Sequence, residues 1–184
     1  SALATNITGV NLTAIGMNAL ILNTESDNTA IGRDSMCTNS TGSSNTAVGV
    51  NSLKANTTGT NNIVMGQASL DANTTGSCNT AIGINSLCSN TTGTQNVAVG
   101  SGSLDAASTG NCNTALGHGV MGENTTGSNN VAVGRTALFS NTTASNNTAV
   151  GVSALEQNIT GACNVAVGFE ALQLNTTADN NTAV

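Results

Sequence analysis

A glycine recurs every 17 residues through most of the chain, and this period constrains the fold more than any other feature. Around each glycine runs one pattern: Asn, Thr or Val, Ala, an aliphatic residue, Gly, two variable residues, a small residue, Leu, two variable residues and Asn-Thr-Thr-Gly. The recurring glycines are Gly32, Gly49, Gly66, Gly83, Gly100, Gly117, Gly134, Gly151 and Gly168, with Gly16 one residue closer. A short period of this kind predicts stacked, nearly identical coils rather than globular domains.

The residues of each period favour β-structure. The apolar positions do not recur at the 3.6-residue spacing of a helix, and Gly, Asn, Thr and β-branched residues disfavour helices. We therefore predict an all-β fold, a β-solenoid or parallel β-roll of about eleven 17-residue coils that covers residues 1–184 as a single array. Each coil is expected to hold a strand of about five residues that ends at the glycine, and a second short strand around the Leu. Neither end carries a polar cap, so we expect a segment of a longer fibre or a unit that stacks end to end.

Two aliphatic columns are predicted to form the core once the coils are stacked. The first directly precedes the glycine and includes Val48, Ile82, Val99, Val133 and Val150. The second lies four residues after the glycine and includes Leu53, Leu87, Leu104, Leu138 and Leu155. The residue two before the glycine is Ala in every coil except that of Val64, and alternation along a strand points it opposite to the first column. This Ala face either packs against a neighbouring chain or places a small residue beside a turn.

A column of asparagines begins the Asn-Thr-Thr-Gly segment, and most of its members lie in acceptor triplets for glycosylation. The possible acceptors in this column are Asn39, Asn56, Asn73, Asn90, Asn124, Asn141, Asn158 and Asn175. Such a column either forms an inward ladder that satisfies the backbone of the turns, or carries glycans on a surface turn. We prefer the ladder, because glycans every ~4.8 Å would crowd one another.

A column of threonines ends the same triplets and could present regular hydroxyl groups to an ordered lattice. Its members are Thr41, Thr58, Thr75, Thr92, Thr109, Thr126, Thr143, Thr160 and Thr177. This column is the basis of an alternative function, a lattice- or glycan-binding solenoid that resembles ice-binding proteins.

Charge and side-chain chemistry argue against several other functions. The net charge is −6 with three basic residues, which leaves no cationic surface for nucleic acid, and no apolar stretch is long enough to span a membrane. His118 is the single histidine and has no patterned Ser or carboxylate near it, so we expect no enzyme, no catalytic residue, no cofactor and no metal. Five cysteines fall into two columns, too far apart within a column for disulfides along the array. Cys78 and Cys88 are the one local pair that could cross between the columns; the others are free thiols or pair between chains.

The motif Asn-x-Ala-Val/Ile-Gly followed by x-x-Ser/Ala-Leu, as in residues 147–155, is similar to the head repeats of trimeric autotransporter adhesins and to fibre repeats of phages and other viruses. The resemblance covers essentially the whole chain and implies a left-handed parallel β-roll that forms a three-chain bundle. It also implies a structural component of an extracellular fibre or adhesin at a cell or virion surface. The partners it implies are copies of the chain, in a lateral trimer or an end-to-end filament, and host surface or matrix. The repeats of this family are usually shorter than 17 residues, and no coiled-coil stalk is visible here.

Overall fold

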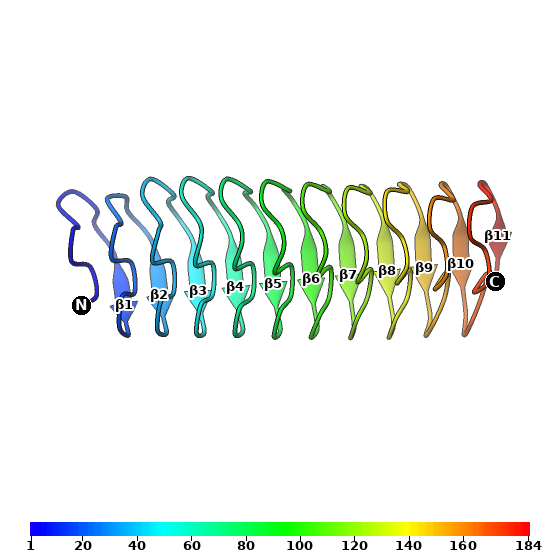
Figure 1. Ribbon diagram of the computed structural model, residues 1–184, viewed down its shortest axis with the longest axis horizontal. Helices are drawn as coiled ribbons and strands as arrows, with labels where there is room; N and C mark the ends of the chain where they lie inside the picture. The colour runs from blue at the N-terminus through cyan, green and yellow to red at the C-terminus, as the bar shows by residue number, and fades with distance from the viewer.

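The computed structural model describes residues 1–184 and shows a rod-shaped parallel β-solenoid (Figure 1). Each complete coil contributes one strand, and the eleven strands pair in chain order into a single parallel sheet. The strands are β1 (Thr13–Ile15), β2 (Thr29–Ile31), β3 (Thr46–Val48), β4 (Ile63–Met65), β5 (Thr80–Ile82), β6 (Val97–Val99), β7 (Thr114–Leu116), β8 (Val131–Val133), β9 (Thr148–Val150), β10 (Val165–Val167) and β11 (Thr182–Ala183). The predicted all-β solenoid of 17-residue coils is confirmed. The structure contains no helix that could cross a membrane.

The strands pair in a register that places equivalent positions of successive coils side by side. Between β5 and β6, for example, Ala81 lies opposite Ala98 and Ile82 lies opposite Val99. The strands β1–β10 have three residues and β11 has two, rather than the expected five, and the second strand expected around the Leu is absent. Leu87 has a φ of 52°, and its equivalents in other coils are similar, so this segment turns through a left-handed conformation that cannot continue a strand.

Backbone hydrogen bonds join neighbouring coils around their whole perimeter. Of 115 backbone–backbone hydrogen bonds, 95 lie outside the strands. The Leu53 N–H donates to the Ser69 carbonyl at 3.0 Å, and the Thr57 N–H donates to the Thr74 carbonyl at 2.9 Å. Ten steps of ~4.8 Å between eleven strands give a rod about 50 Å long. Because turns as well as strands are cross-linked in this way, bending the rod would break many bonds at once.

The recurring glycine is required where each strand ends. Gly83 has a φ of +132°, and a Cβ at this position would collide with the backbone carbonyl of Gly100 in the next coil. Any other residue would therefore be strained by its conformation and by its contact with the neighbouring coil. The strict 17-residue spacing of these glycines follows from stacking one such corner upon another.

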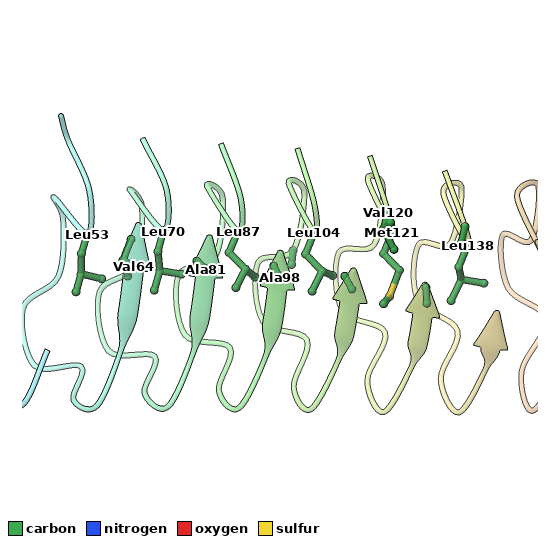
Figure 2. Close-up of a cluster of buried hydrophobic side chains, with 14 of the residues drawn as sticks. Leu53, Val64, Leu70, Ala81, Leu87, Ala98, Leu104, Val120, Met121 and Leu138 are labelled. Carbon is green, nitrogen blue, oxygen red and sulfur yellow. The ribbon is translucent and has the colours of Figure 1, made fainter. Parts of the chain in front are cut away.

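The core is a thin column of leucines that packs against the alanines of the strands (Figure 2). All five predicted leucines of the second column, Leu53, Leu87, Leu104, Leu138 and Leu155, lie fully buried. The middle residue of most strands is also fully buried, as at Ala81 and Ala98. Figure 2 shows the leucine side chains in one row facing these strands.

The prediction that the aliphatic column before the glycine forms the core is wrong. Val48, Ile82, Val99, Val133 and Val150 occupy the third strand position, are only partly buried, and point away from the interior. Side chains alternate along a strand, so only one face can line the coil, and the coil is too narrow to hold a second row of large side chains beside the leucines. The near-invariant Ala therefore marks the inner face.

Candidate functional site

Two columns of buried asparagines run the length of the rod inside the coils. We call the first the turn ladder; it consists of Asn23, Asn39, Asn56, Asn73, Asn90, Asn124, Asn141, Asn158 and Asn175. We call the second the strand ladder; it consists of Asn28, Asn45, Asn62, Asn79, Asn96, Asn113, Asn130, Asn147, Asn164 and Asn181. All these residues are fully buried except Asn175 and Asn181 in the last coil.

The turn ladder is held by hydrogen bonds within and between coils. Asn73 Nδ2 donates to Asn56 Oδ1 at 2.8 Å and to the carbonyl of Gly76, in its own turn, at 3.0 Å. Asn39, Asn56, Asn90, Asn141, Asn158 and Asn175 make the same pair of bonds, with an alanine carbonyl in place of glycine at two of them. Each amide thus satisfies a turn carbonyl that would otherwise be buried without a donor.

The possible glycan acceptors of this column lie inside the coils. Asn39, Asn56, Asn73, Asn90, Asn124, Asn141 and Asn158 are fully buried, and Asn175 is partly buried only because it lies in the last coil. A glycan on Nδ2 would replace a hydrogen-bonding proton and would need a passage through the packed turn. Of the two alternatives, the inward ladder is the one that the structure contains.

The strand ladder binds the strand to the turn of the next coil. Asn79 Nδ2 donates to the Gly93 carbonyl at 2.9 Å, while Asn62 Oδ1 accepts from the Asn79 backbone N–H at 3.0 Å. Sequence reasoning did not identify this ladder, although an asparagine that precedes nearly every strand was the available signal.

The turn ladder has one interruption, at Ala107. This alanine is fully buried at a ladder position, between Asn90 and Asn124. Asn90 Oδ1 is consequently buried without a hydrogen-bond partner. Asn124 Nδ2 donates to the carbonyl of Gly127 at 3.0 Å and has no ladder acceptor beneath it. A single missing amide therefore leaves one buried acceptor without a donor and one amide nitrogen with a single partner instead of two.

The outward side of the strands forms a surface without charged residues. We call it the outer sheet face and define it as the first and third residues of β1–β10 together with Thr182 of β11. Every member is Thr, Val, Ile, Leu or Met. Several remain substantially exposed: Ile15 60%, Ile63 51%, Met65 50% and Leu116 37%. From the spacing of strands and residues, this face measures roughly 10 Å by 50 Å, or about 500 Å².

The predicted threonine column lies on a different side of the coil, in the turn. Thr58, Thr75 and Thr92 are exposed, and their hydroxyl groups make no hydrogen bond within the chain. The threonine one residue earlier behaves differently, since Thr74 Oγ1 donates to the Thr91 carbonyl at 3.0 Å. Of these two neighbouring columns, the predicted one is therefore the one that presents free hydroxyl groups to solvent.

Charged and thiol groups gather loosely on a third side but form no metal-binding group. Cys88 Sγ lies 2.6 Å from Asp105 Oδ1, and burial followed by this hydrogen bond raises the pKa of the Cys88 thiol to about 11. Burial also raises the pKa of Asp71, which Lys54 partly offsets. A thiol held protonated in this way is a poor nucleophile. All five cysteines are free, and Cys78, Cys112 and Cys163 are exposed.

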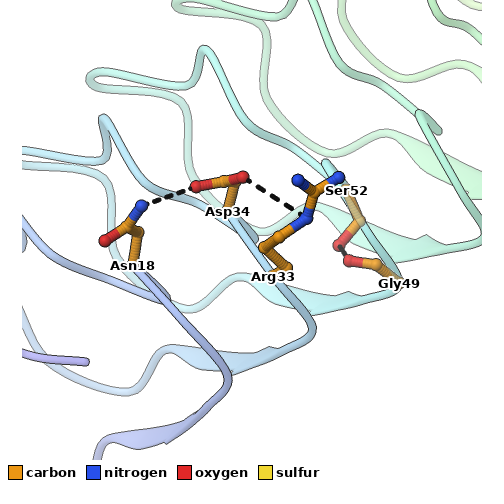
Figure 3. A network of polar contacts seen from close by, with 5 residues as sticks. All are labelled: Asn18, Arg33, Asp34, Gly49 and Ser52. Carbon is orange, nitrogen blue, oxygen red and sulfur yellow. Dashed lines mark hydrogen bonds and ion pairs between the residues drawn. The ribbon is translucent and has the colours of Figure 1, made fainter. Parts of the chain in front are cut away.

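Other polar groups are dispersed along the rod. Arg33 Nε lies 3.8 Å from Asp34 Oδ2, and Asp34 also accepts a hydrogen bond from Asn18 at 2.9 Å (Figure 3). His118 is exposed in the variable column after the glycine. A shallow hollow occurs at the last coil, beside Leu172 and Leu174, where no further coil packs.

Comparison of the chain with protein-family models, with curated proteins and with solved structures finds no match.

Proposed function

We propose that this chain is a non-catalytic structural segment of an extracellular fibre or surface adhesin, and that copies of it associate side by side through the outer sheet face. The observation that carries the proposal is the unbroken aliphatic column on this face, which does not fill the chain's own core. Ile82 of β5 and Val99 of β6 belong to this column. They lie side by side on neighbouring strands, project away from the interior and are only partly buried.

The size and chemistry of the outer sheet face support association with copies of the chain. Its area of about 500 Å² lies in the range of the largest apolar patches on monomers, which are often functional. A stable interface typically buries ~800 Å² on each partner, so lateral association would also have to bury the borders of this face. No charged residue lies on the face, so identical copies meet without repulsion between like charges.

The stacked construction supports a mechanical role. Each coil contacts only its neighbours, and buried asparagines, serines and leucines repeat along the axis. Ser69 Oγ and Ser86 Oγ, for instance, lie 2.9 Å apart in successive coils. A rod of this type keeps its surfaces in fixed register over its length, which suits a fibre that presents binding surfaces away from a cell or virion.

Sedimentation of matched variants tests the proposal. In the first variant, Ile82, Val99 and Val133 on the outer sheet face are replaced by Thr, which retains β-branching. In the control, the same replacement is made after the glycine, at Val50, Ile84 and Val152.

We expect the parent and the control to sediment as oligomers at micromolar concentration, and the sheet-face variant as an 18.0 kDa monomer with an unchanged circular dichroism spectrum. A parent chain that remains monomeric at these concentrations would contradict lateral association through this face.

The second candidate function is that of a lattice- or glycan-binding module. It rests on the free hydroxyl groups of the threonine column, such as those of Thr75 and Thr92, which repeat once per coil. Replacing Thr58, Thr75 and Thr92 by Val would remove these hydroxyls. If this function holds, the parent inhibits ice recrystallisation or binds a crystalline polysaccharide, and the variant does so weakly; equal inactivity of both would exclude it.

A further inference from the structure

We propose that this chain is synthesised and folded in a compartment that does not attach glycans to asparagine, because its own acceptor triplets would otherwise prevent the coils from closing. The proposal is independent of the fibre function and rests on the positions of the acceptor nitrogens. Eight members of the turn ladder begin an Asn-x-Thr triplet, among them Asn56-Thr57-Thr58 and Asn73-Thr74-Thr75. These are sequences that asparagine glycosylation uses wherever the reaction operates.

The acceptor nitrogen of each ladder triplet is enclosed. Asn56 Nδ2 donates to Asn39 Oδ1 at 2.6 Å and to the Gly59 carbonyl at 3.0 Å, so both its protons are used. The residue is fully buried. A glycan would remove one of these bonds and would place a bulky polar group between two coils that are in direct contact.

The surroundings of the ladder amides leave no room even for a methyl group. A Cβ built at Gly76 would overlap Asn73 Oδ1 and would lie 3.0 Å from Asn90 Nδ2. Gly59 is confined in the same way, with Asn73 Nδ2 2.9 Å from its hypothetical Cβ. Outward rotation of a modified asparagine would also leave the turn carbonyl of its own coil buried without a donor.

Three of the four other triplets in the chain provide an internal contrast. They begin at Asn11, Asn146 and Asn180, which precede a strand by two residues and are exposed. The Nδ2 atoms of Asn146 and Asn180 make no hydrogen bond, so a glycan there would extend into solvent. The fold therefore tolerates the modification at the corner of a coil and not in the ladder.

Glycosylation would precede folding, so the ladder triplets would determine whether the coils can close. Glycans are transferred to acceptor triplets while the chain is still unfolded, when ladder and corner asparagines are equally accessible. One modified ladder residue stops its own coil from closing, and because each coil is stabilised by its neighbours, the stack is interrupted there. Because the chain has eight such positions, at least one of them would be modified in almost every molecule.

Expression of the same chain in two compartments tests the inference. One sample is made in the cytosol, and the other is directed into the secretory pathway of a eukaryotic cell that glycosylates asparagine. A third sample is a secreted variant in which the third residue of every ladder triplet is replaced by Ala. These are Thr41, Thr58, Thr75, Thr92, Thr126, Thr143, Thr160 and Thr177, whose exposed hydroxyls make no hydrogen bonds. A fourth is the parent chain secreted in the presence of an inhibitor of asparagine glycosylation, which leaves the sequence unchanged.

We expect the cytosolic chain to be unmodified and to melt cooperatively by circular dichroism. The secreted parent should carry glycans on ladder asparagines by mass spectrometry, lose the cooperative transition and be degraded rapidly by protease. The secreted variant and the inhibitor-treated parent should recover the cytosolic transition. A secreted parent with glycans on Asn56 or Asn73 and an unaltered transition would overturn the inference, as would one that folds with every ladder triplet unmodified.

Discussion

In β6, Ala98 and Val99 are adjacent in the chain, yet they face environments that tolerate different changes. Ala98 is fully buried against the leucine column, at a position that holds Ala in every coil except that of Val64. Val99 is partly exposed on the outer sheet face, where Ile, Leu and Met also occur in other coils. The inner face of the strand is therefore limited by volume, whereas the outer face requires only β-forming, uncharged residues.

The largest effect should come from shortening a leucine of the interior. Leu87→Ala removes a fully buried side chain from a column that continues through every coil, so it leaves a cavity that the stacked neighbours cannot close. We expect a loss of about 2–5 kcal/mol in the free energy of unfolding. Ile84→Ala, three residues earlier and 53% exposed, is the matched control and should cost far less. Urea titration followed by circular dichroism is the suitable measurement, since the chain has no Trp or Tyr to report by fluorescence. Equal losses for the two variants would contradict the assignment of inner and outer positions.

The next largest effect comes from comparing substitutions on the inner and outer faces of one strand, β6. Ala98→Val should destabilise the chain by about 1–3 kcal/mol, because it adds two methyl groups to a close-packed interior. Val99→Ala, the reciprocal exchange on the next residue, should cost less, since it removes atoms that are already partly exposed. The two thermal midpoints by circular dichroism give the order directly. If Val99→Ala proved the more damaging in the monomer, the aliphatic column would have to contribute to the core after all.

These two faces also explain how far the sequence could predict the structure. The 17-residue period and the absence of helical spacing were sufficient for the solenoid, and Leu53 and Leu87 could be placed inside. The assignment of Val48 and Ile82 to the core failed because hydrophobicity alone does not distinguish the two sides of a strand. The better signal was the small size of the alternate residue, which is Ala in nearly every coil and reflects the narrow interior.

The asparagine columns show a different limit of sequence reasoning. A repeated Asn-Thr-Thr triplet is compatible with an inward ladder and with a glycosylated surface turn, because both require the same residues. Only the path of the coil shows that Asn73 Nδ2 meets Asn56 Oδ1 rather than solvent. The unsatisfied Oδ1 of Asn90 likewise depends on knowing which residue lies above it.

A smaller effect, in the stabilising direction, should follow from repairing the turn ladder. Ala107→Asn would supply a donor to Asn90 Oδ1, which has no partner now, and a second acceptor to Asn124 Nδ2, which now donates only to the Gly127 carbonyl. Net gains of ~0.5–1.5 kcal/mol for each intramolecular hydrogen bond, reduced by the side-chain entropy that is lost, predict an increase of about 1 kcal/mol. The thermal midpoint should rise, and the rise should shrink when Asn90 is replaced by Ala. A fall in the midpoint in both backgrounds would show that the gap is too small for an amide.

The smallest effect is expected in the turn, on the surface that faces away from the ladder. Thr75→Val removes a hydroxyl that makes no hydrogen bond and retains the β-branched shape, so the free energy of unfolding should change by no more than ~0.5 kcal/mol. Thr74→Val, its neighbour in the chain, is the control, because the Thr74 hydroxyl donates to the Thr91 carbonyl at 3.0 Å and its loss should cost about 1 kcal/mol. Parallel urea titrations would resolve this difference. A cost at Thr75 that equals the cost at Thr74 would mean that the column's hydroxyls are engaged in the folded chain, and the free hydroxyl surface on which lattice binding depends would not exist.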